Sequence, residues 1–98
     1  MSRRERRKGV RLMNQSSDAS WIEQNDRLEK TFKFSTFRDA MGFMLRVSYE
    51  CDHMDHHPTW KNTYNQVWVS LNTHDAGDKV TEKDHALAKV MDQIYRKV

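Results

Sequence analysis

Histidine is concentrated in one short stretch of the sequence. The nine residues DHMDHHPTW, residues 52–60, contain three of the five histidines in the chain together with two aspartates, a proline and a tryptophan. Imidazole has an unperturbed pKa of about 6.5, so it can donate and accept protons near neutral pH. Asp52 and Asp55 could orient the ring N–H groups, and His74 begins a loop from which a third imidazole could reach the same pocket. The pattern predicts a proton-transfer site.

A helix is expected to carry this cluster at its end. From Thr36, a plausible N-cap, apolar side chains recur at steps of three and four, which is the period of one helical face. Pro58 cannot continue a helix. A helix that extended to the cluster would place His53, His56 and His57 on one side. The residues predicted to share the helix face are Phe37, Ala40, Met41, Met44, Val47, Ser48 and Cys51.

Alternating apolar and polar residues predict strands on both sides of this helix. Residues 21–34 are expected to form a hairpin around an Asn-Asp pair, and residues 63–73 contain a strand with one aliphatic face. Residues 81–98 form a second predicted helix that begins at a capping box of Thr81 and Asp84. The order of elements predicts an α+β fold: a small antiparallel sheet of about four strands with two to three helices packed on one face.

The formal net charge of +3 is unevenly distributed along the 98 residues. Residues 1–11 contain six basic side chains and one acidic side chain, so they carry +5 and the remainder carries −2. Residues 1–20 are predicted to be a basic, disordered N-terminal tail, and residues 21–98 a single folded domain. A basic tail can bind phosphates, but the folded part has no positive excess, so nucleic acid is not the expected partner.

The cysteine content and the hydropathy indicate the redox state of the compartment and whether the chain crosses a membrane. A single cysteine excludes a disulfide within the chain and fits a reducing compartment. No apolar run approaches the ~20 residues of a membrane span. We expect a soluble, cytoplasmic protein that does not associate with membranes.

Metal binding is an alternative reading of the histidine-rich stretch, because zinc accepts imidazole and carboxylate ligands. On a helix, however, adjacent His56 and His57 diverge by about 100°, and both reaching one ion would be strained. The predicted site therefore contains no metal. The sequence also has no phosphate-binding glycine loop and no serine or cysteine in an evident activated setting, which argues against phosphoryl transfer and covalent catalysis.

The spacing of these residues resembles the pattern of the pterin-4a-carbinolamine dehydratases. That pattern is an acidic residue, three spacers, His-His-Pro, an aromatic residue six positions beyond the proline, a histidine ten further on, and a later aspartate. The matching positions are Asp52, His56, His57, Pro58, Tyr64, His74 and Asp84. The segment FKFSTFRDAMGFMLRV also resembles the strand-to-helix region of the family, and the similarity extends from Trp21 to Tyr95.

The resemblance implies dehydration of 4a-hydroxytetrahydropterin to quinonoid dihydropterin and water, which recycles the pterin after aromatic amino-acid hydroxylation. The pterin is the substrate, no cofactor is implied, and the expected assembly is a homodimer or homotetramer. His57 and His74 are expected to transfer protons, with His56 binding substrate and sharing the acid–base work. The candidate substrate-binding residues are Asp52, Asp55, Pro58, Trp60, Tyr64 and Asp84.

Several of these roles have structural alternatives. Asp52 either orients His56 or is a solvated helix carboxylate, and Asp84 could act through the capping box alone. Trp60 and Tyr64 could stack on a flat heterocycle or pack in the sheet. Some members of the family are also dimerisation partners of a transcription factor, so a non-catalytic coactivator-type interaction protein is the alternative function. Residues 1–20 depart from the family, because they lack an evident amphipathic helix before the first strand.

Overall fold

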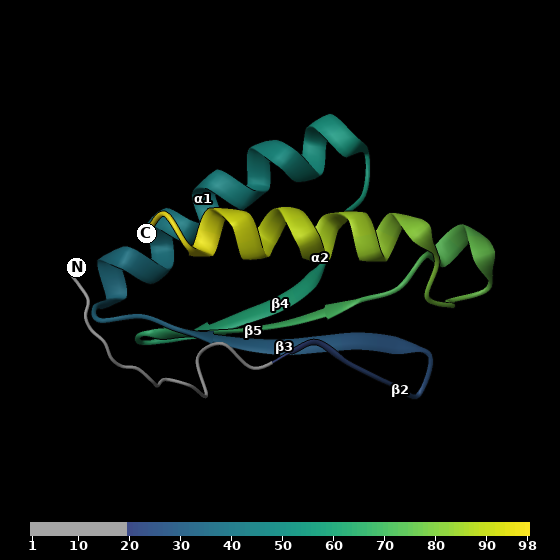
Figure 1. Cartoon of the computed structure of the whole chain (residues 1–98), viewed down its shortest axis with the longest axis horizontal. Coiled ribbons are helices and arrows are strands. Elements are labelled where there is room, and N and C mark those ends of the chain that lie inside the picture. The colour runs from purple at the N-terminus through teal and green to yellow at the C-terminus, as the bar shows by residue number, and fades with distance from the viewer. Residues whose placement is uncertain (1–19) are drawn as a thin grey trace.

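The computed structural model describes residues 20–98, which form one four-stranded antiparallel sheet with two helices on a single face (Figure 1). The predicted tail of residues 1–20 falls almost entirely outside the described part. The strands are β2 (Ile22–Gln24), β3 (Arg27–Lys33), β4 (Thr59–Thr63) and β5 (Gln66–Leu71). The helices are α1 (Phe37–Met54), the short 3₁₀ helix η3 (His74–Ala76) and α2 (Glu82–Tyr95). The predicted α+β class is confirmed.

Two hairpins build the sheet in the order β2-β3-β5-β4. The β2–β3 turn is the predicted Asn25-Asp26 pair, and both residues have positive φ, 54° and 59°. Asn and Asp tolerate this left-handed conformation, and two such residues in succession match the twist of a tight hairpin. The edge strand next to β5 is β4, whose sequence TWKNT contains no aliphatic side chain. Its pairing with β5 therefore defines it as a strand more than its own residues do.

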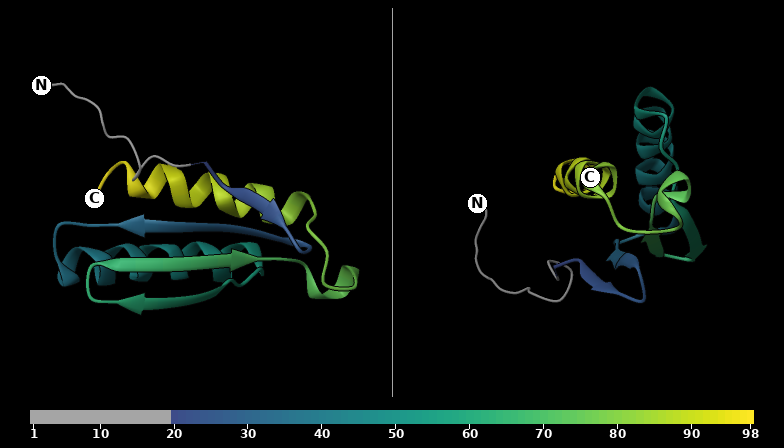
Figure 2. Two further views of the ribbon diagram at one scale, coloured as in Figure 1. Left: turned by 90° about the horizontal axis from the view of Figure 1, so that it is seen from below. Right: turned by 90° about the vertical axis from the view of Figure 1, so that its right-hand side faces the viewer.

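The register of the β4–β5 hairpin determines where the histidines meet. Thr59, the first residue of β4, pairs with Ser70 near the end of β5. The chain segments before β4 and after β5 consequently lie at the same end of the sheet. The C-terminal end of α1 and the N-terminal end of α2 lie at this end as well (Figures 1 and 2).

The core fills the space between the helices and one face of the sheet. Alternate residues of β5, namely Val67, Val69 and Leu71, are fully buried, and Phe32 of β3 packs against Phe43 of α1 with ring centroids 4.8 Å apart. Burial of each such side chain contributes about 1.5–3 kcal/mol. The second helix adds Leu87 and Met91, one helical turn apart, to this core.

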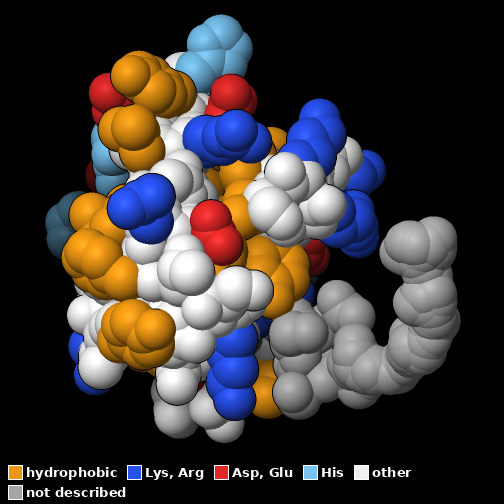
Figure 3. Space-filling model, turned by 90° about the vertical axis from the view of Figure 1, so that its left-hand side faces the viewer, with side chains coloured by type: hydrophobic (Ala, Val, Ile, Leu, Met, Phe, Trp, Pro, Cys, Tyr) orange, Lys and Arg blue, Asp and Glu red, His pale blue; other side chains and the backbone are white. Residues whose placement is uncertain are grey.

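The orientation of α1 differs in part from the prediction. Its buried residues are Ala40, Phe43, Val47 and Cys51, whereas Phe37 and Met41 are 49% and 43% exposed. The helix has two apolar rows, and the row that contains Phe43 packs inward because its aromatic ring meets Phe32. The outward row, which we call the α1 ridge, consists of Phe37, Met41, Leu45 and Tyr49. Hydrophobic side chains gather along one side of the end view in Figure 3, beside basic side chains.

The start of the folded part is held by a polar cluster. The indole N–H of Trp21 and the ammonium of Lys30 both donate to the carboxylate of Asp92 on α2, at 3.2 and 2.9 Å. Lys30 also lies 4.8 Å from the ring centroid of Phe32, a cation–π contact. These contacts join β3 and the residue before β2 to α2. Among residues 20–98, no helix has both the length and the apolar character needed to cross a membrane.

Candidate active site

The end of α1 places the histidine pair. Asp55 adopts a left-handed conformation, with φ 52° and ψ 46°, and ends the helix. The N–H of His56 then donates to the carbonyl of Cys51 at 3.0 Å, as in a Schellman-type cap. His56 and His57 therefore lie beyond the helix, and the expectation that they share a helical face with His53 is wrong. The reversal of the backbone buries His56, which is 8% exposed, and leaves His57 exposed.

A buried carboxylate holds His56. Nε2 of His56 lies 2.6 Å from Oδ1 of Asp84, which has no exposed surface. The other oxygen of Asp84 accepts from the hydroxyl of Thr73 at 2.8 Å and from the backbone N–H of Thr81 at 2.9 Å. Because this carboxylate accepts from its neighbours, the ring N–H of His56 points at Asp84. Nε2 is then the ring nitrogen that carries the proton, and Nδ1 is the other one.

Asp84 thus has two roles that the sequence presented as alternatives. It is the N3 residue of the predicted capping box of α2, which is present in full. It also binds His56, which is 28 positions earlier in the chain. Asp52, for which the sequence left two roles open, is a solvated carboxylate and does not orient His56. Its carboxylate lies 3.1 Å from Nε2 of His57, and the two side chains are 84% and 59% exposed.

His74 lies across from this pair, in the loop after β5. It opens η3, which ends at Gly77 with φ 77°, and the backbone N–H of Thr73 donates to the carbonyl of Lys79 at 2.8 Å. Nδ1 of His74 lies 3.0 Å from a carboxylate oxygen of Asp78. The hydrogen bond and the charge of Asp78, together with the charge of Asp75, raise the pKa of His74 above 6.5. The cationic form of this imidazole is favoured.

Replacing Asp78 with asparagine is expected to lower the pKa of His74, because a neutral amide no longer stabilises the imidazolium. Asn also tolerates the positive φ of 60° at this position, so the loop is retained. Titration of the His74 ring protons by NMR measures the change. Asp75→Asn is the matched control and is expected to give a smaller fall, since Asp75 is the lesser cause. Equal pKa values in wild type and Asp78→Asn would contradict the assignment.

The three histidines line one open cavity of about 240 Å³. The other lining residues are Asp55, Asn72, Thr73, Asp75 and Lys83. Of the predicted residues, the cavity brings together the histidines and Asp55. Sequence reasoning missed the contribution of Lys83, which comes from the first turn of α2. Thr73 and Asp75 flank His74 in the sequence, and that adjacency is the signal that could have found them.

The remaining candidate residues do not line this cavity within the single chain. Pro58 leads into β4, and Trp60 is partly buried against the core. Tyr64 occupies the β4–β5 turn with a positive φ of 50° and is 65% exposed. That turn is at the opposite end of the hairpin from the histidines. Asp84 lies behind His56, away from the open space.

The thiol of Cys51, at the end of α1, is unreactive. Burial raises the pKa of the Cys51 thiol to about 11, with the neighbouring charges of Asp52 and Glu50 adding to the effect. The thiol is therefore protonated at neutral pH and is a poor nucleophile. Within residues 20–98, no three His, Cys, Asp or Glu side chains are grouped to hold a metal ion. The cavity brings together three imidazoles, a side chain that can donate and accept protons near neutral pH.

Comparison with known proteins shows the family to which the chain belongs. A family model described as pterin 4 alpha carbinolamine dehydratase matches residues 1–94. A protein of Opitutus terrae, named as a candidate pterin-4-alpha-carbinolamine dehydratase, is 50% identical over 74 residues, which are 76% of this chain and 76% of that protein.

Solved structures show the same fold. A Brucella melitensis protein described as a transcriptional coactivator/pterin dehydratase is similar with a TM-score of 0.74 and 37% identity, over 78% of this chain and 82% of that one. A pterin dehydratase-like protein identified as a RuBisCO assembly factor in the alpha-carboxysome has a TM-score of 0.70 over 84% of this chain and 96% of its own. At 20% identity, the latter shows likeness of fold alone. By its sequence match and its close relatives, the chain belongs to the pterin 4 alpha carbinolamine dehydratase family.

Proposed function

We propose that this protein is a hydro-lyase that dehydrates 4a-hydroxytetrahydropterin to quinonoid dihydropterin and water. The observation that carries the proposal is the convergence of His56, His57 and His74 on one cavity. Membership of the family supplies the substrate class. The proposal places the protein in pterin recycling in the cytoplasm.

The reaction breaks the C4a–O bond and forms a C4a–N5 double bond. The departing hydroxyl needs a proton to leave as water, and the N5–H proton needs a base. We assign the acid to His74, because Asp78 and Asp75 favour its cationic form. His57, paired with Asp52, is the base that accepts the N5 proton. Proton exchange with solvent then restores both groups, so the cycle needs neither metal nor cofactor.

His56 has a positioning role in this scheme, and it can share the acid–base work. Asp84 fixes its ring orientation, and Nδ1 is available to bind the substrate. Lys83 and Asp55 line the same cavity and offer a cation and an acceptor to the polar edge of a pterin. The cavity is open, so both substrate and water can enter and leave.

Stopped-flow absorbance of freshly generated 4a-hydroxytetrahydropterin tests the proposal. Wild type is expected to accelerate dehydration well above the spontaneous rate, and a folded His56→Ala/His57→Ala variant is expected to lose the acceleration. His53→Ala/His85→Ala is the matched control, since neither imidazole lines the cavity. Well-folded wild type that leaves the spontaneous rate unchanged would remove the dehydratase assignment.

We further propose that the protein is a homodimer or homotetramer that pairs through the α1 ridge. Exposed Leu45 and Tyr49, at 59% and 68%, have apolar neighbours one and two turns away along the same helix. Such a row at steps of four is the pattern by which helices pack on each other. Sedimentation is expected to show an oligomer for wild type and a monomer for Leu45→Glu. A Leu45→Glu protein of unchanged mass would exclude the ridge as the contact.

The same ridge favours a second candidate function, a coactivator-type interaction protein. The Brucella melitensis relative is described as a transcriptional coactivator as well as a pterin dehydratase. An apolar helix face that is uncovered in the single chain can pair with another protein as well as with a second copy. Dehydratase activity in the stopped-flow assay decides whether any such role is additional or replaces catalysis.

A further inference from the structure

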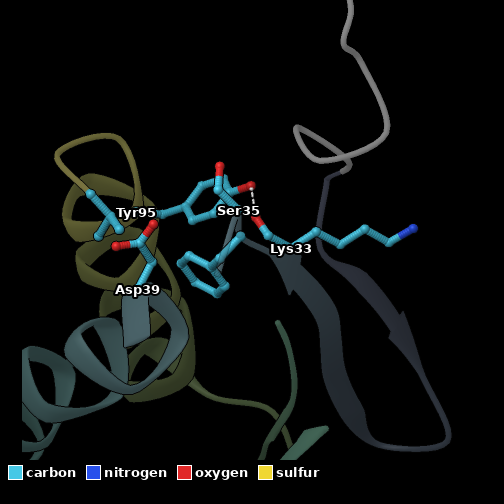
Figure 4. Close-up of a pocket in the computed structure, with 6 residues that line it drawn as sticks. Lys33, Ser35, Asp39 and Tyr95 are labelled. Atoms are coloured by element: carbon cyan, nitrogen blue, oxygen red, sulfur yellow. Dashed lines mark hydrogen bonds between the residues drawn. The ribbon is translucent and has the colours of Figure 1, made fainter. Parts of the chain in front are cut away.

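A second cavity lies far along α1 from the histidines. It has a volume of about 230 Å³ and lies between the first half of α1 and Lys97 and Val98, which follow α2. It adjoins a cavity of about 330 Å³ that shares Asp39 and Val98 with it and extends to Phe34 and Tyr95. Figure 4 shows the adjoining cavity, where the Tyr95 hydroxyl donates to the carbonyl of Lys33 at 2.7 Å. We call the two together the α1–α2 groove.

The groove is lined by cations that lack counterions in the described part of the chain. Arg38, Arg46 and Lys97 all line the smaller cavity. None of them has an ion pair within residues 20–98. Asp39 is the one acidic side chain among the described residues that line it, so the lining side chains carry a net charge of +2. Three like charges that face one space favour an anion there.

Gly42 provides the space for that anion. A glycine inside a helix lowers helix stability relative to alanine, and close packing of another element would be the usual reason for it. The structure excludes that reason within residues 20–98, because a Cβ at Gly42 would meet nothing within 4 Å. Arg38 and Arg46 lie one helical turn to either side of Gly42, so their side chains flank the open backbone.

We propose that the α1–α2 groove binds a small phosphorylated molecule, with its phosphate over Gly42 between Arg38 and Arg46. The planar guanidinium group binds phosphate oxygens through two parallel hydrogen bonds. The adjoining cavity has a mainly polar lining, in which the rings of Phe34 and Tyr95 are the surfaces on which an aromatic part of the ligand could pack. This inference is independent of the dehydratase proposal.

The groove is separate from the histidine site. Asp55, at the end of α1, is thirteen positions beyond Gly42, which is about 20 Å at 1.5 Å per residue. A molecule that fills the groove cannot touch the histidines. The ligand is therefore distinct from the pterin.

Amide NMR of the full chain, titrated with inorganic phosphate and with phenyl phosphate, tests the proposal. The chain has three glycines, whose amide signals are readily resolved. Gly42 reports on the groove, and Gly77 reports on the loop beside the histidines. Saturable movement of the Gly42 signal, with Gly77 unmoved and with tighter binding of phenyl phosphate than of phosphate, is the expected result. A stationary Gly42 signal, or equal movement of Gly42 and Gly77, would overturn the proposal.

Variants sharpen the result. Arg38→Gln/Arg46→Gln is expected to weaken phenyl phosphate binding at least tenfold, since two charge-assisted contacts are lost. Lys89→Gln, an exposed charge on α2 outside the groove, is expected to bind as wild type does. Gly42→Ala is expected to weaken binding while it stabilises the helix. If Arg38→Gln/Arg46→Gln bound phenyl phosphate as tightly as wild type, the proposed phosphate position would be wrong. If Lys89→Gln weakened binding by the same factor, the effect would be one of overall charge, and the proposed position would again be wrong.

Discussion

Replacing Asp84 with alanine is expected to lower the free energy of unfolding by about 3–5 kcal/mol. Three donors lose their acceptor at once: the His56 ring N–H, the Thr73 hydroxyl and the Thr81 backbone N–H. A buried donor without a partner costs about 1–3 kcal/mol. For a domain of this size the melting temperature is expected to fall by roughly 15–25 °C, and thermal unfolding followed by circular dichroism measures it.

Two variants serve as controls for this effect. Asp52→Ala removes a carboxylate that also touches a histidine, but its 84% exposure predicts a change within about 0.5 kcal/mol. Asp84→Asn keeps the shape but turns an amide N–H₂ toward neighbours that donate, so an intermediate loss is expected. If Asp84→Ala melted at the temperature of Asp52→Ala, the His56–Asp84 pair would not stabilise the fold.

Replacing His74 with alanine is expected to leave the fold intact and slow the catalysed dehydration by about 100-fold or more. Positioned acid–base groups contribute about 10²–10⁴-fold to rates. The His74 side chain is 91% exposed and lies outside the core, so its loss removes little packing. Stopped-flow turnover and thermal unfolding of the same preparation separate the two effects.

The pH dependence of turnover tests whether His74 is the group that donates the proton. If the cationic imidazole donates the proton, turnover falls as the pH rises through the pKa of His74. Asp78 raises that pKa, so Asp78→Asn is expected to move this limb of the profile to lower pH while the maximal rate is retained. Undiminished turnover by folded His74→Ala would assign the acid to another group.

Local patterns in the sequence were sufficient for the two helices and for the first hairpin. The capping box of Thr81 and Asp84, the Asn25-Asp26 turn and the alternation of β5 each depend on residues close together in the chain. The convergence of the histidines on one cavity, suggested by their chemistry, requires the hairpin register as well.

Contacts between distant residues could not be predicted in the same way. The His56–Asp84 bond joins residues 28 positions apart, and nothing local distinguishes it from a His56–Asp52 contact, which was one of the two alternatives for Asp52. The end of α1 was uncertain for another reason: a left-handed Asp55 competes with continued helix, and propensity alone does not decide. The face of α1 that packs inward depends on Phe32, which belongs to a different element.

The β4–β5 hairpin has a consequence for how the sequence can change in length. Its turn at Tyr64 is five paired residues, about 17 Å, from the end at which the histidines lie. A residue inserted at the turn lengthens a surface loop and leaves the pairing unchanged. A residue inserted within β4 shifts the pairing by one position and reverses the faces of the displaced residues. His56 and His57 would then move by about 3.4 Å relative to His74, so insertions and fused tags are tolerated at the turn and disable the site when they are placed inside the strand.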